Sequence, residues 1–354
     1  MAGTPNQNRT WLQQIAHGLS WRSAALLHRA RPVLEVGLDT YWRQRLRLDW
    51  LRRSPAQRDY GGAGQGSAGQ GLAGQGSAGQ GLAGRGGAGQ ASHGHAPHGL
   101  PAPLIISLTS FPGRYDTLVL TLKSLLTQSV RADQVILWIA AEHQAALPPA
   151  VLDLQQHGLT IASCDNTLRS HNKYLHTRRR HPGAFIVTAD DDTYYWRHWL
   201  AELIDDYDPA QRVIPCHRVH TVTLQSDGRP AAYRSWQWES AGTMAGPLVF
   251  PTGVGGVLYP PGCLPDEVDD PDRILALCPR ADDVWLYWMA QRNGWLFRKT
   301  LPWRRLHHWR HSQTQGLMWE NVYNANGNDA QIAVMIEAYG WPPMVRQVIR
   351  AAQT

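Results

Sequence analysis

An apolar stretch that ends in three consecutive carboxylates is the feature that most restricts how this chain can fold. Residues 185–189 read FIVTA, and Asp190, Asp191 and Asp192 follow directly. Adjacent carboxylates repel one another and are costly to remove from water. A fold can therefore place them beside a buried strand only if positive charge lies next to them. A divalent cation carrying a phosphorylated ligand would supply that charge, because ligands of open α/β sheets bind beyond the carboxyl ends of the strands. The alternative is a solvated turn or a helix N-cap at Asp192.

Strand-like segments alternate with helix-like segments from residue 103 to residue 192. We expect strands at 104–109, 134–139, 159–162 and 185–189, and helices at 115–128, 149–157 and 170–180. This alternation specifies a parallel α/β sheet with helices on its faces. Beyond residue 192 we expect a less regular second half built on the same sheet. Its predicted elements are a hairpin near 226–228, a glycine-rich strand region at 252–259, and helices near 281–292 and 328–339.

A low-complexity segment divides the chain into unequal parts. Residues 61–99 repeat GQGSA and GQGLA and contain nothing that buries a core, so they are expected to form a flexible tether. Residues 1–60 hold ten Arg and four Asp or Glu, whereas the rest of the chain holds 24 basic and 24 acidic residues. We therefore expect a basic, Trp-rich helical segment at 1–60, a linker at 61–99 that lets this segment move independently, and a main domain at 100–345.

The charge distribution also bears on partners. A main domain without a basic excess argues against nucleic acid as its partner. In the N-terminal segment, tryptophans and leucines recur at helical spacing between arginines, with Pro32 as an expected break. Such a segment suits peripheral contact with the headgroup layer of an anionic membrane. It equally suits a helical hairpin that docks on the main domain or on a partner protein.

Cysteine usage and hydrophobicity indicate a protein of the cytoplasm. The four cysteines, Cys164, Cys216, Cys263 and Cys278, lie far apart without the spacing of a zinc site, so we expect free, buried thiols. No run of about 18 apolar residues occurs, and the first residues lack the form of a secretion signal. We expect a cytoplasmic protein that is peripheral at the inner face of the membrane.

Six motifs follow one another along the main domain. They are SLTSFPGR at 107–114, QVILW at 134–138, TADDD at 188–192, CHRVH at 216–220, TGVGGVLYPP at 252–261 and ADDVW at 281–285. Together they resemble bacterial glycosyltransferases of the GT-A fold, of the family-2-like kind found in polysaccharide and lipopolysaccharide gene clusters. The resemblance covers residues 103 to about 340. It implies a Rossmann-like mixed α/β sheet flanked by helices, to which the N-terminal helical segment is an appendage.

The resemblance implies a metal-dependent transfer of a sugar from a nucleotide-sugar donor, a UDP-sugar in the first instance, to a glycan or lipid-linked acceptor. Mn²⁺ or Mg²⁺ would bridge the donor diphosphate to Asp190 and Asp192, with His308 as a further ligand. Asp192 is the first choice as direct ligand. In an extended backbone Asp191 points the other way, where it would contact the nucleotide or cap a helix. His308 has the alternative of a structural role or an acceptor contact.

The resemblance also gives a role to a second acidic pair, Asp282 and Asp283. In these enzymes an acidic pair at this place supplies the general base that deprotonates the acceptor hydroxyl, which then attacks the anomeric carbon with inversion. We assign Asp283 as that base. From the spacing alone, capping of the helix that follows is the simpler interpretation.

Further residues are candidates for contacts with donor and acceptor. For the nucleotide and its phosphates these are Thr109, Ser110, Arg114, Lys173, Asp190 and Asp191, and for the sugar and acceptor Gly253, Gly255, Gly256, His217 and Arg218. Glycines let a sugar ring approach the backbone closely. The alternatives are a solvated helix charge for Lys173 and core packing for His217. Residues 140–142 read AAE where many relatives carry DDGS, so the identity of the nucleotide stays open.

Two other functions compete with this interpretation. A sugar-phosphate nucleotidyltransferase uses related sheets and paired acids, but the SFPGR sequence at 110–114 is a poor version of its basic glycine-rich loop. A non-catalytic carbohydrate-binding or scaffold protein on a decayed GT-A fold is the second. The intact Asp190, Asp192 and Asp283 argue against such decay.

Overall fold

The computed structural model describes residues 21–52, 98–227, 229–300, 305–312 and 327–353, and over 21–34 it describes the backbone alone. Apart from its last two positions, the predicted linker lies outside these described residues. The start of the predicted N-terminal segment lies outside them as well.

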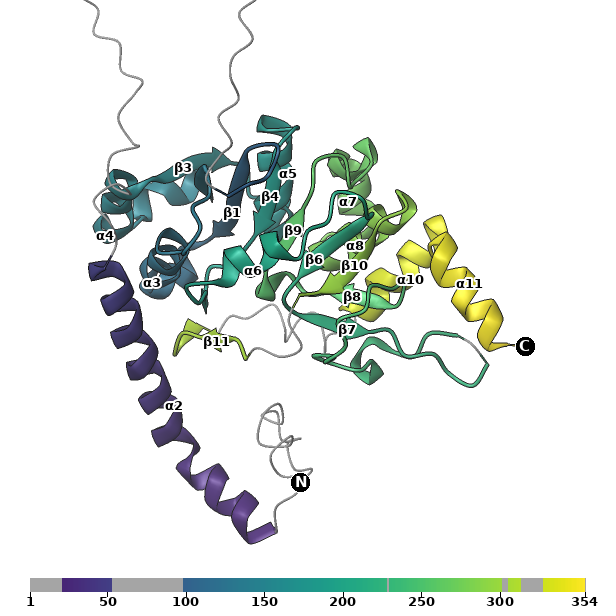
Figure 1. Ribbon diagram of the computed structural model, residues 1–354, viewed down its shortest axis with the longest axis horizontal. Helices are drawn as coiled ribbons and strands as arrows, with labels where there is room; N and C mark the ends of the chain where they lie inside the picture. The colour runs from purple at the N-terminus through teal and green to yellow at the C-terminus, as the bar shows by residue number, and fades with distance from the viewer. Residues whose placement is uncertain (1–20, 53–97, 228, 301–304, 313–326, 354) are drawn as a thin grey trace, which may run out of the picture.

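The main domain is built on a seven-stranded mixed sheet with the strand order β10-β6-β9-β4-β1-β2-β3 (Figure 1). Its strands are β1 (Leu104–Ser110), β2 (Gln134–Ala140), β3 (Leu159–Cys164), β4 (Phe185–Thr188), β6 (Val213–Cys216), β9 (Val257–Tyr259) and β10 (Leu296–Lys299). All neighbours are parallel except β9, which is antiparallel to both β4 and β6. The prediction of a mixed α/β sheet is confirmed, and the second half of the domain completes the same sheet.

Helices cover both faces of the sheet because its strands are apolar on both sides. On one face, Leu104, Ile106 and Leu108 of β1 share a core cluster with α3 (Tyr115–Leu126) and α6 (Trp199–Asp205). On the other face, Ser107 hydrogen-bonds to Thr177 of α5 (Asn172–Arg180) at 2.6 Å. A second large cluster on that face packs α5 with α7 (Pro271–Leu277) and α8 (Asp282–Arg292). The helices α10 (Asn328–Tyr339) and α11 (Pro343–Ala352) pack outside α8.

Two predicted elements take a different form. The expected helix at 149–157 is a short α4 (Pro149–Leu152) that tightens into a 3-10 turn, η4 (Asp153–His157). The glycine-rich region at 252–259 is a strand only in its second half, because η7 (Gly253–Gly255) forms a 3-10 turn before β9. The hairpin near 226–228 is present, since Gln225 N donates to Arg229 O at 2.6 Å. This hairpin lies in the connection between β7 (Val219–Thr221) and β8 (Val249–Pro251), which form a small antiparallel sheet.

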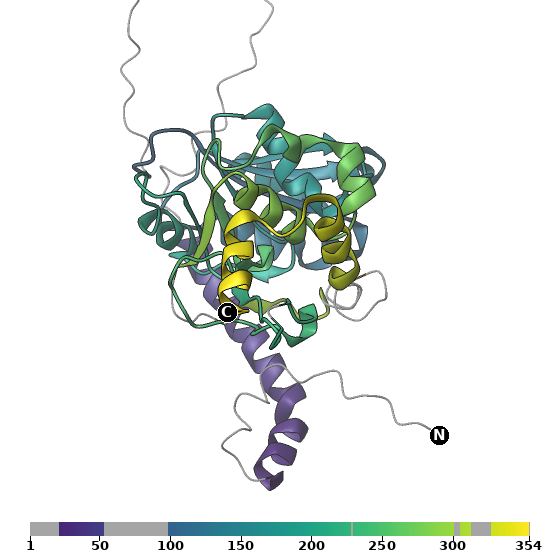
Figure 2. The same ribbon diagram turned by 90° about the vertical axis from the view of Figure 1, so that its right-hand side faces the viewer.

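The described part of the N-terminal segment forms one long helix, α2 (Trp21–Leu51), which projects from the main domain in both views (Figures 1 and 2). The expected break at Pro32 is wrong, because the helix continues through it. A proline costs about 3 kcal/mol inside a helix, which weakens a helix of 31 residues without ending it. The second half of α2 packs on α3 and beside a two-stranded sheet of β5 (Thr193–Tyr194) and β11 (His307–His308). This agrees with docking on the main domain, as a single helix and not as the expected hairpin. Independent movement of the segment stays a prediction.

Two expectations about the chain as a whole can also be compared with the structure. All four cysteines are free and buried, as predicted. Among the described helices, none combines the length and the apolar character that crossing a membrane requires.

Candidate functional site

Several segments bring polar side chains to one edge of the sheet. The carboxyl ends of β1, β4 and β6 meet there because these strands run parallel, and β9 begins there because it is antiparallel. The residues after β4, the turn before β9 and the first turn of α8 therefore lie close together. Two clusters of charged side chains occupy this edge.

The first cluster is organised by Lys173, which lies in the first turn of α5. Its Nζ is 2.8 Å from Asp190 Oδ1 and 2.9 Å from Asp282 Oδ2, and the lysine side chain is 7% exposed. Burial disfavours the charged lysine, but Asp190, Asp282 and Asp283 raise the pKa of Lys173 well above its usual value. Burial likewise raises the pKa of Asp282, yet Lys173 brings it below the usual value. Lys173 is thus a buried cation shared by two carboxylates, not a solvated helix charge.

Asp283 has a different environment from its neighbour Asp282. Its Oδ1 accepts a hydrogen bond from Gly253 N at 2.9 Å, so the side chain joins α8 to the turn before β9 and does not cap its own helix. Burial, followed by the adjacent Asp282, raises the pKa of Asp283 to about 7. A β carbon on Gly253 would lie 2.9 Å from Asp283 Oδ1 and 3.1 Å from Lys173 Nζ. A carboxyl group that titrates near neutral pH is suited to accept a proton in a reaction.

The second cluster contains Asp191 and Asp192. Asp192 Oδ2 accepts a hydrogen bond from Arg114, and Asp191 Oδ2 accepts one from Ser110 Oγ at 2.6 Å. Although burial opposes the charge on Asp192, His308 and Arg114 hold its pKa far below the usual value. Burial, together with Asp192, raises the pKa of Asp191 to about 7.

The grouping of these acids differs from the strand alternation that we expected, which put Asp190 and Asp192 on one side and Asp191 on the other. β4 ends at Thr188, and the acids lie in an irregular turn before β5. Side chains alternate with a period of two only in extended backbone. In this turn the Asp190 side chain therefore contacts Lys173, while Asp191 and Asp192 lie together in the second cluster.

The predicted site for Mn²⁺ or Mg²⁺ can be compared with these positions. The Asp190 side chain is 31% exposed, whereas Asp192 is 7% exposed and both of its carboxylate oxygens accept hydrogen bonds. His308 Nδ1 lies 3.5 Å from Asp192 Oδ1 and 3.1 Å from Thr193 Oγ1. Over the described residues, no three His, Cys, Asp or Glu side chains are grouped to hold a metal ion. As the more exposed of the two carboxylates, Asp190 is chemically suited to hold such an ion together with nucleotide phosphates. Asp190, Asp192 and His308 as metal ligands all stay predictions.

The predicted acceptor residues lie around the turn before β9. Arg218 Nη1 donates to Thr252 Oγ1 at 2.9 Å, and Arg218 Nη2 donates to Glu239 Oε1 at 3.1 Å. A β carbon on Gly255 would lie 2.6 Å from Arg218 Cβ. Gly256 has a φ of 98°, and its β carbon would lie 2.4 Å from the Trp199 ring. These two glycines are therefore required by packing within the protein, while Gly253 alone faces the charged cluster.

Two other predicted residues are engaged by the protein. His217 is buried, its Nε2 lies 2.8 Å from Trp199 O, and its ring packs against Trp196, which is the packing alternative. Thr109 Oγ1 donates to Trp138 O at 3.0 Å. The ligand contacts of Thr109 and His217 stay predictions.

Sequence reasoning missed Tyr195, which ties the site together. Its hydroxyl accepts a hydrogen bond from Asp190 N at 2.7 Å and donates one to Val254 O at 3.1 Å. It also missed Glu239, the partner of Arg218. In the sequence Tyr195 belongs to an aromatic run, and nothing marks it apart from a core residue.

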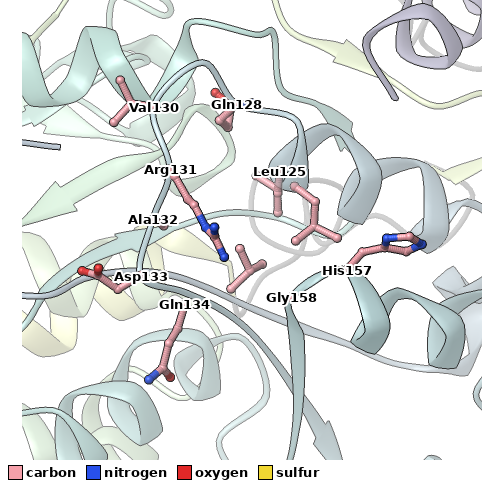
Figure 3. A pocket seen from close by; sticks show the side chains of 11 residues that line it. Leu125, Gln128, Val130, Arg131, Ala132, Asp133, Gln134, His157 and Gly158 are labelled. Atoms are coloured by element: carbon pink, nitrogen blue, oxygen red, sulfur yellow. The ribbon is translucent and has the colours of Figure 1, made fainter. Parts of the chain in front are cut away.

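A cavity of about 30 Å³ lies at the opposite edge of the sheet. It is lined by the end of α3, the loop before β2 and the turn at His157 and Gly158 (Figure 3). Pockets for drug-sized ligands span roughly 300–1,000 Å³, so this cavity is too small for a nucleotide. The charged edge remains the candidate site.

Comparisons with known proteins give limited likenesses. No protein-family model matches the chain, and no curated protein matches its sequence. The inositol-1-phosphate CTP transferase from T. maritima is similar with a TM-score of 0.34 and 9% identity, covering 56% of this chain and 84% of that one. The mannosyltransferase PcManGT from Pyrobaculum calidifontis, in complex with GDP-Man and Mn²⁺, is similar with a TM-score of 0.33 and 14% identity. This match covers 73% of this chain and 75% of that one. At these scores the likenesses carry no functional argument.

Proposed function

We propose that the protein is a metal-dependent glycosyltransferase that moves a sugar from a nucleotide-sugar donor to a glycan or lipid-linked acceptor with inversion. The observation that carries the proposal is the pairing of Asp283, whose pKa is raised to about 7, with a buried Lys173–Asp190–Asp282 cluster at the carboxyl end of β4. Asp283 as a base, beside the partly exposed carboxylate of Asp190, suits the transfer of a sugar from a donor whose leaving group is a nucleoside diphosphate. The motif resemblance agrees with this assignment.

In the proposed reaction the acceptor hydroxyl oxygen forms the new bond to the anomeric carbon. Its proton passes to the Asp283 carboxylate. The bond from the anomeric carbon to the donor phosphate oxygen breaks, and its electron pair leaves with the nucleoside diphosphate. The hydrogen bond from Gly253 N fixes one carboxylate oxygen, which orients the base toward the acceptor.

The leaving diphosphate needs positive charge. A divalent cation held by Asp190 would neutralise that charge when bound. Lys173 stays protonated between Asp190 and Asp282, so it holds the Asp190 carboxylate in place. Ser110 and Arg114 lie at the end of β1, where we place the nucleotide, with a UDP-sugar as the first donor to test.

The rival nucleotidyltransferase needs free basic groups after the first strand to hold nucleotide phosphates. Here the guanidinium of Arg114 is buried and pairs with Asp192, which favours the glycosyltransferase. The two functions differ in product. A nucleotidyltransferase releases pyrophosphate from a nucleoside triphosphate and a sugar phosphate, whereas a glycosyltransferase releases a nucleoside diphosphate.

The test is a thermal-shift panel of the full chain with UDP, GDP, CDP and TDP, each with Mn²⁺ and with EDTA. A ligand that binds only the native state raises the melting temperature by mass action. We expect one nucleoside diphosphate to raise it with metal and to lose that effect with EDTA. Absence of any shift, or shifts only with nucleoside triphosphates, would count against the proposal.

A further inference from the structure

The described side chains of α2 divide into two faces of opposite character. Between residues 35 and 52 the acidic residues are Glu35, Asp39 and Asp49, and the basic ones are Arg43, Arg45, Arg47 and Arg52. Asp39 and Asp49 are buried, and Glu35 lies one turn before Asp39 on the same side and is half-buried. The four arginines are exposed. The helix therefore turns its acids toward the protein. Arg43 and Arg45 form ion pairs with Asp39 and Asp49 at the border between the two faces.

The inner face is fixed by specific contacts. The Trp42 ring lies 4.7 Å from the Tyr194 ring, and Leu46 is buried with Tyr194 and Trp309. Asp39 Oδ1 accepts a hydrogen bond from Arg310 N at 3.1 Å. The Trp42 ring also lies 5.9 Å from the His307 ring, so these contacts hold α2 against both strands of the β5–β11 sheet.

The outer face exposes apolar side chains that the described part of the chain does not cover. Tyr41 is 52% exposed, Leu48 is 48% exposed and Leu51 is 69% exposed. At 100° per residue, Tyr41 and Leu48 lie within about 20° of each other, on the side opposite Leu46 and Asp39. Arg45 and Arg52 flank them, and Arg47 lies beside Leu51 on the helix surface. Apolar groups flanked by arginines suit the headgroup layer of an anionic membrane.

We propose that this outer face, made of Tyr41, Leu48 and Leu51 with Arg45, Arg47 and Arg52, binds an anionic lipid surface while the inner face stays docked. The charge complementarity commits the face to anionic lipid, because its charged side chains are three arginines and it carries no acid. The helix then acts as a rigid adaptor and not as the end of a free tether.

The docking site of α2 lies next to the candidate site. Trp309, packed under α2, donates from its backbone N to Asp192 O at 3.0 Å. A membrane bound at the outer face would therefore lie at a fixed position relative to the charged edge. This step rests on the proposed function, since it would present a lipid-linked acceptor to that edge in a constant orientation.

The experiment is co-sedimentation of the full chain with vesicles of phosphatidylcholine that contain phosphatidylglycerol, compared with phosphatidylcholine alone. We expect binding to the anionic vesicles that weakens with salt. Arg47→Gln combined with Arg52→Gln should weaken it by about fivefold for each arginine. The charge-matched control is Arg229→Gln combined with Arg234→Gln, both exposed and away from α2, which should bind as the unchanged protein does.

The apolar contribution has its own matched pair. Leu48→Glu on α2 should abolish vesicle binding, whereas Leu275→Glu, which replaces a leucine of α7 that is 39% exposed, should retain it. The proposal would be overturned if Leu48→Glu and Leu275→Glu lost vesicle binding equally, or if the two double arginine variants did. Equal binding to vesicles with and without phosphatidylglycerol would also overturn it. Concentration-dependent self-association without lipid binding would assign the face to a second copy instead. Nucleotide-induced thermal shifts measured on the same samples separate a failure here from a failure of the proposed function.

Discussion

At the residue scale, the surroundings of the two adjacent acids of α8 shift their pKa values in opposite directions. Lys173 favours the charged form of Asp282, which lowers its pKa despite burial, whereas burial and Asp282 raise the pKa of Asp283 to about 7. Carboxyl groups whose pKa values are driven apart are suited to different roles. Asp282 is charged at neutral pH and holds Lys173, and Asp283 can exchange a proton near neutral pH.

Replacing Asp283 by Asn keeps the shape of the side chain and removes the base. We expect the rate of sugar transfer to fall by about 10²- to 10⁴-fold, which is the usual contribution of general-base catalysis, while donor binding is retained. Transfer assays and thermal shifts with the nucleotide measure the two effects. Asp272→Asn, in the exposed first turn of α7, is the control and should leave both unchanged. Full transfer by Asp283→Asn would remove Asp283 as the base.

The raised pKa of Asp283 also predicts how stability changes with pH. The folded protein holds this proton up to about pH 7, whereas the unfolded chain releases it near 3.8. The contribution is therefore fully present below pH 3.8 and is lost as the pH rises toward 7. Since Asn does not titrate, Asp283→Asn should gain stability relative to the unchanged protein between about pH 5 and about pH 8. Urea unfolding at both pH values measures this gain, and a constant difference would contradict the prediction.

Gly253 tests how tightly the first cluster is packed. In Gly253→Ala the new methyl group meets Asp283 Oδ1 and Lys173 Nζ at 2.9 and 3.1 Å, so the base must shift. We expect kcat to fall by about tenfold or more, because small displacements of catalytic groups are costly. Gly246→Ala is the matched change, since its methyl group would meet its nearest neighbour at 3.7 Å. Equal effects of the two substitutions on kcat would show that the contact with Asp283 is unimportant.

At the element scale, the sequence predicts the regular segments of the main domain well, because hydrophobic periodicity reports directly on strands and helices. β4, α5 and α8 fall where FIVTA, the helical run after residue 170 and ADDVW place them. The turn at 189–192 is not predictable in this way. Its side chains are directed by Lys173, Ser110 and Arg114, and a pattern of alternating residues holds no information about partners that arrive from other elements.

The two-residue strands β5 and β11 are likewise absent from the sequence pattern. They exist because Trp309 and α2 pack around them, and Asp39 and Arg310, which form one of the bonds, are 271 residues apart in sequence. Contacts of this kind decide where α2 docks and cannot be read from its amphipathic character, which fits a membrane equally well. For the same reason the sequence left the membrane and docked alternatives open.

Trp42 is the residue of α2 that we expect to matter most for docking. It is half-buried against Tyr194 and His307, so Trp42→Ala should lower the free energy of unfolding by about 1–3 kcal/mol, less than for a fully buried tryptophan. Its sequence neighbour Tyr41 is exposed on the other face, and Tyr41→Ala should change stability by less than about 0.5 kcal/mol. Urea unfolding of both variants measures the contrast. Equal losses would show that α2 is not docked through this face.

At the scale of the whole molecule, the glycine-rich repeat connects α2 covalently to the domain on which it docks. If it forms the flexible linker that its composition predicts, docking is an intramolecular event at an effective concentration of about millimolar. The chain therefore tolerates a docking contact that would be weak between separate molecules.

Cutting the repeat at an introduced protease site should make the docking depend on concentration. We expect the two pieces to co-elute from a size-exclusion column at high protein concentration and to separate on dilution, because the effective concentration is lost with the linker. In the cut Trp42→Ala variant, separation should occur at a concentration about tenfold higher for each 1.4 kcal/mol of docking energy removed. The cut Tyr41→Ala variant should separate at the same concentration as the cut, otherwise unchanged protein. Pieces that separate at every concentration, or that separate identically in the Trp42→Ala and Tyr41→Ala variants, would contradict a docked α2 and with it a fixed orientation of the charged edge.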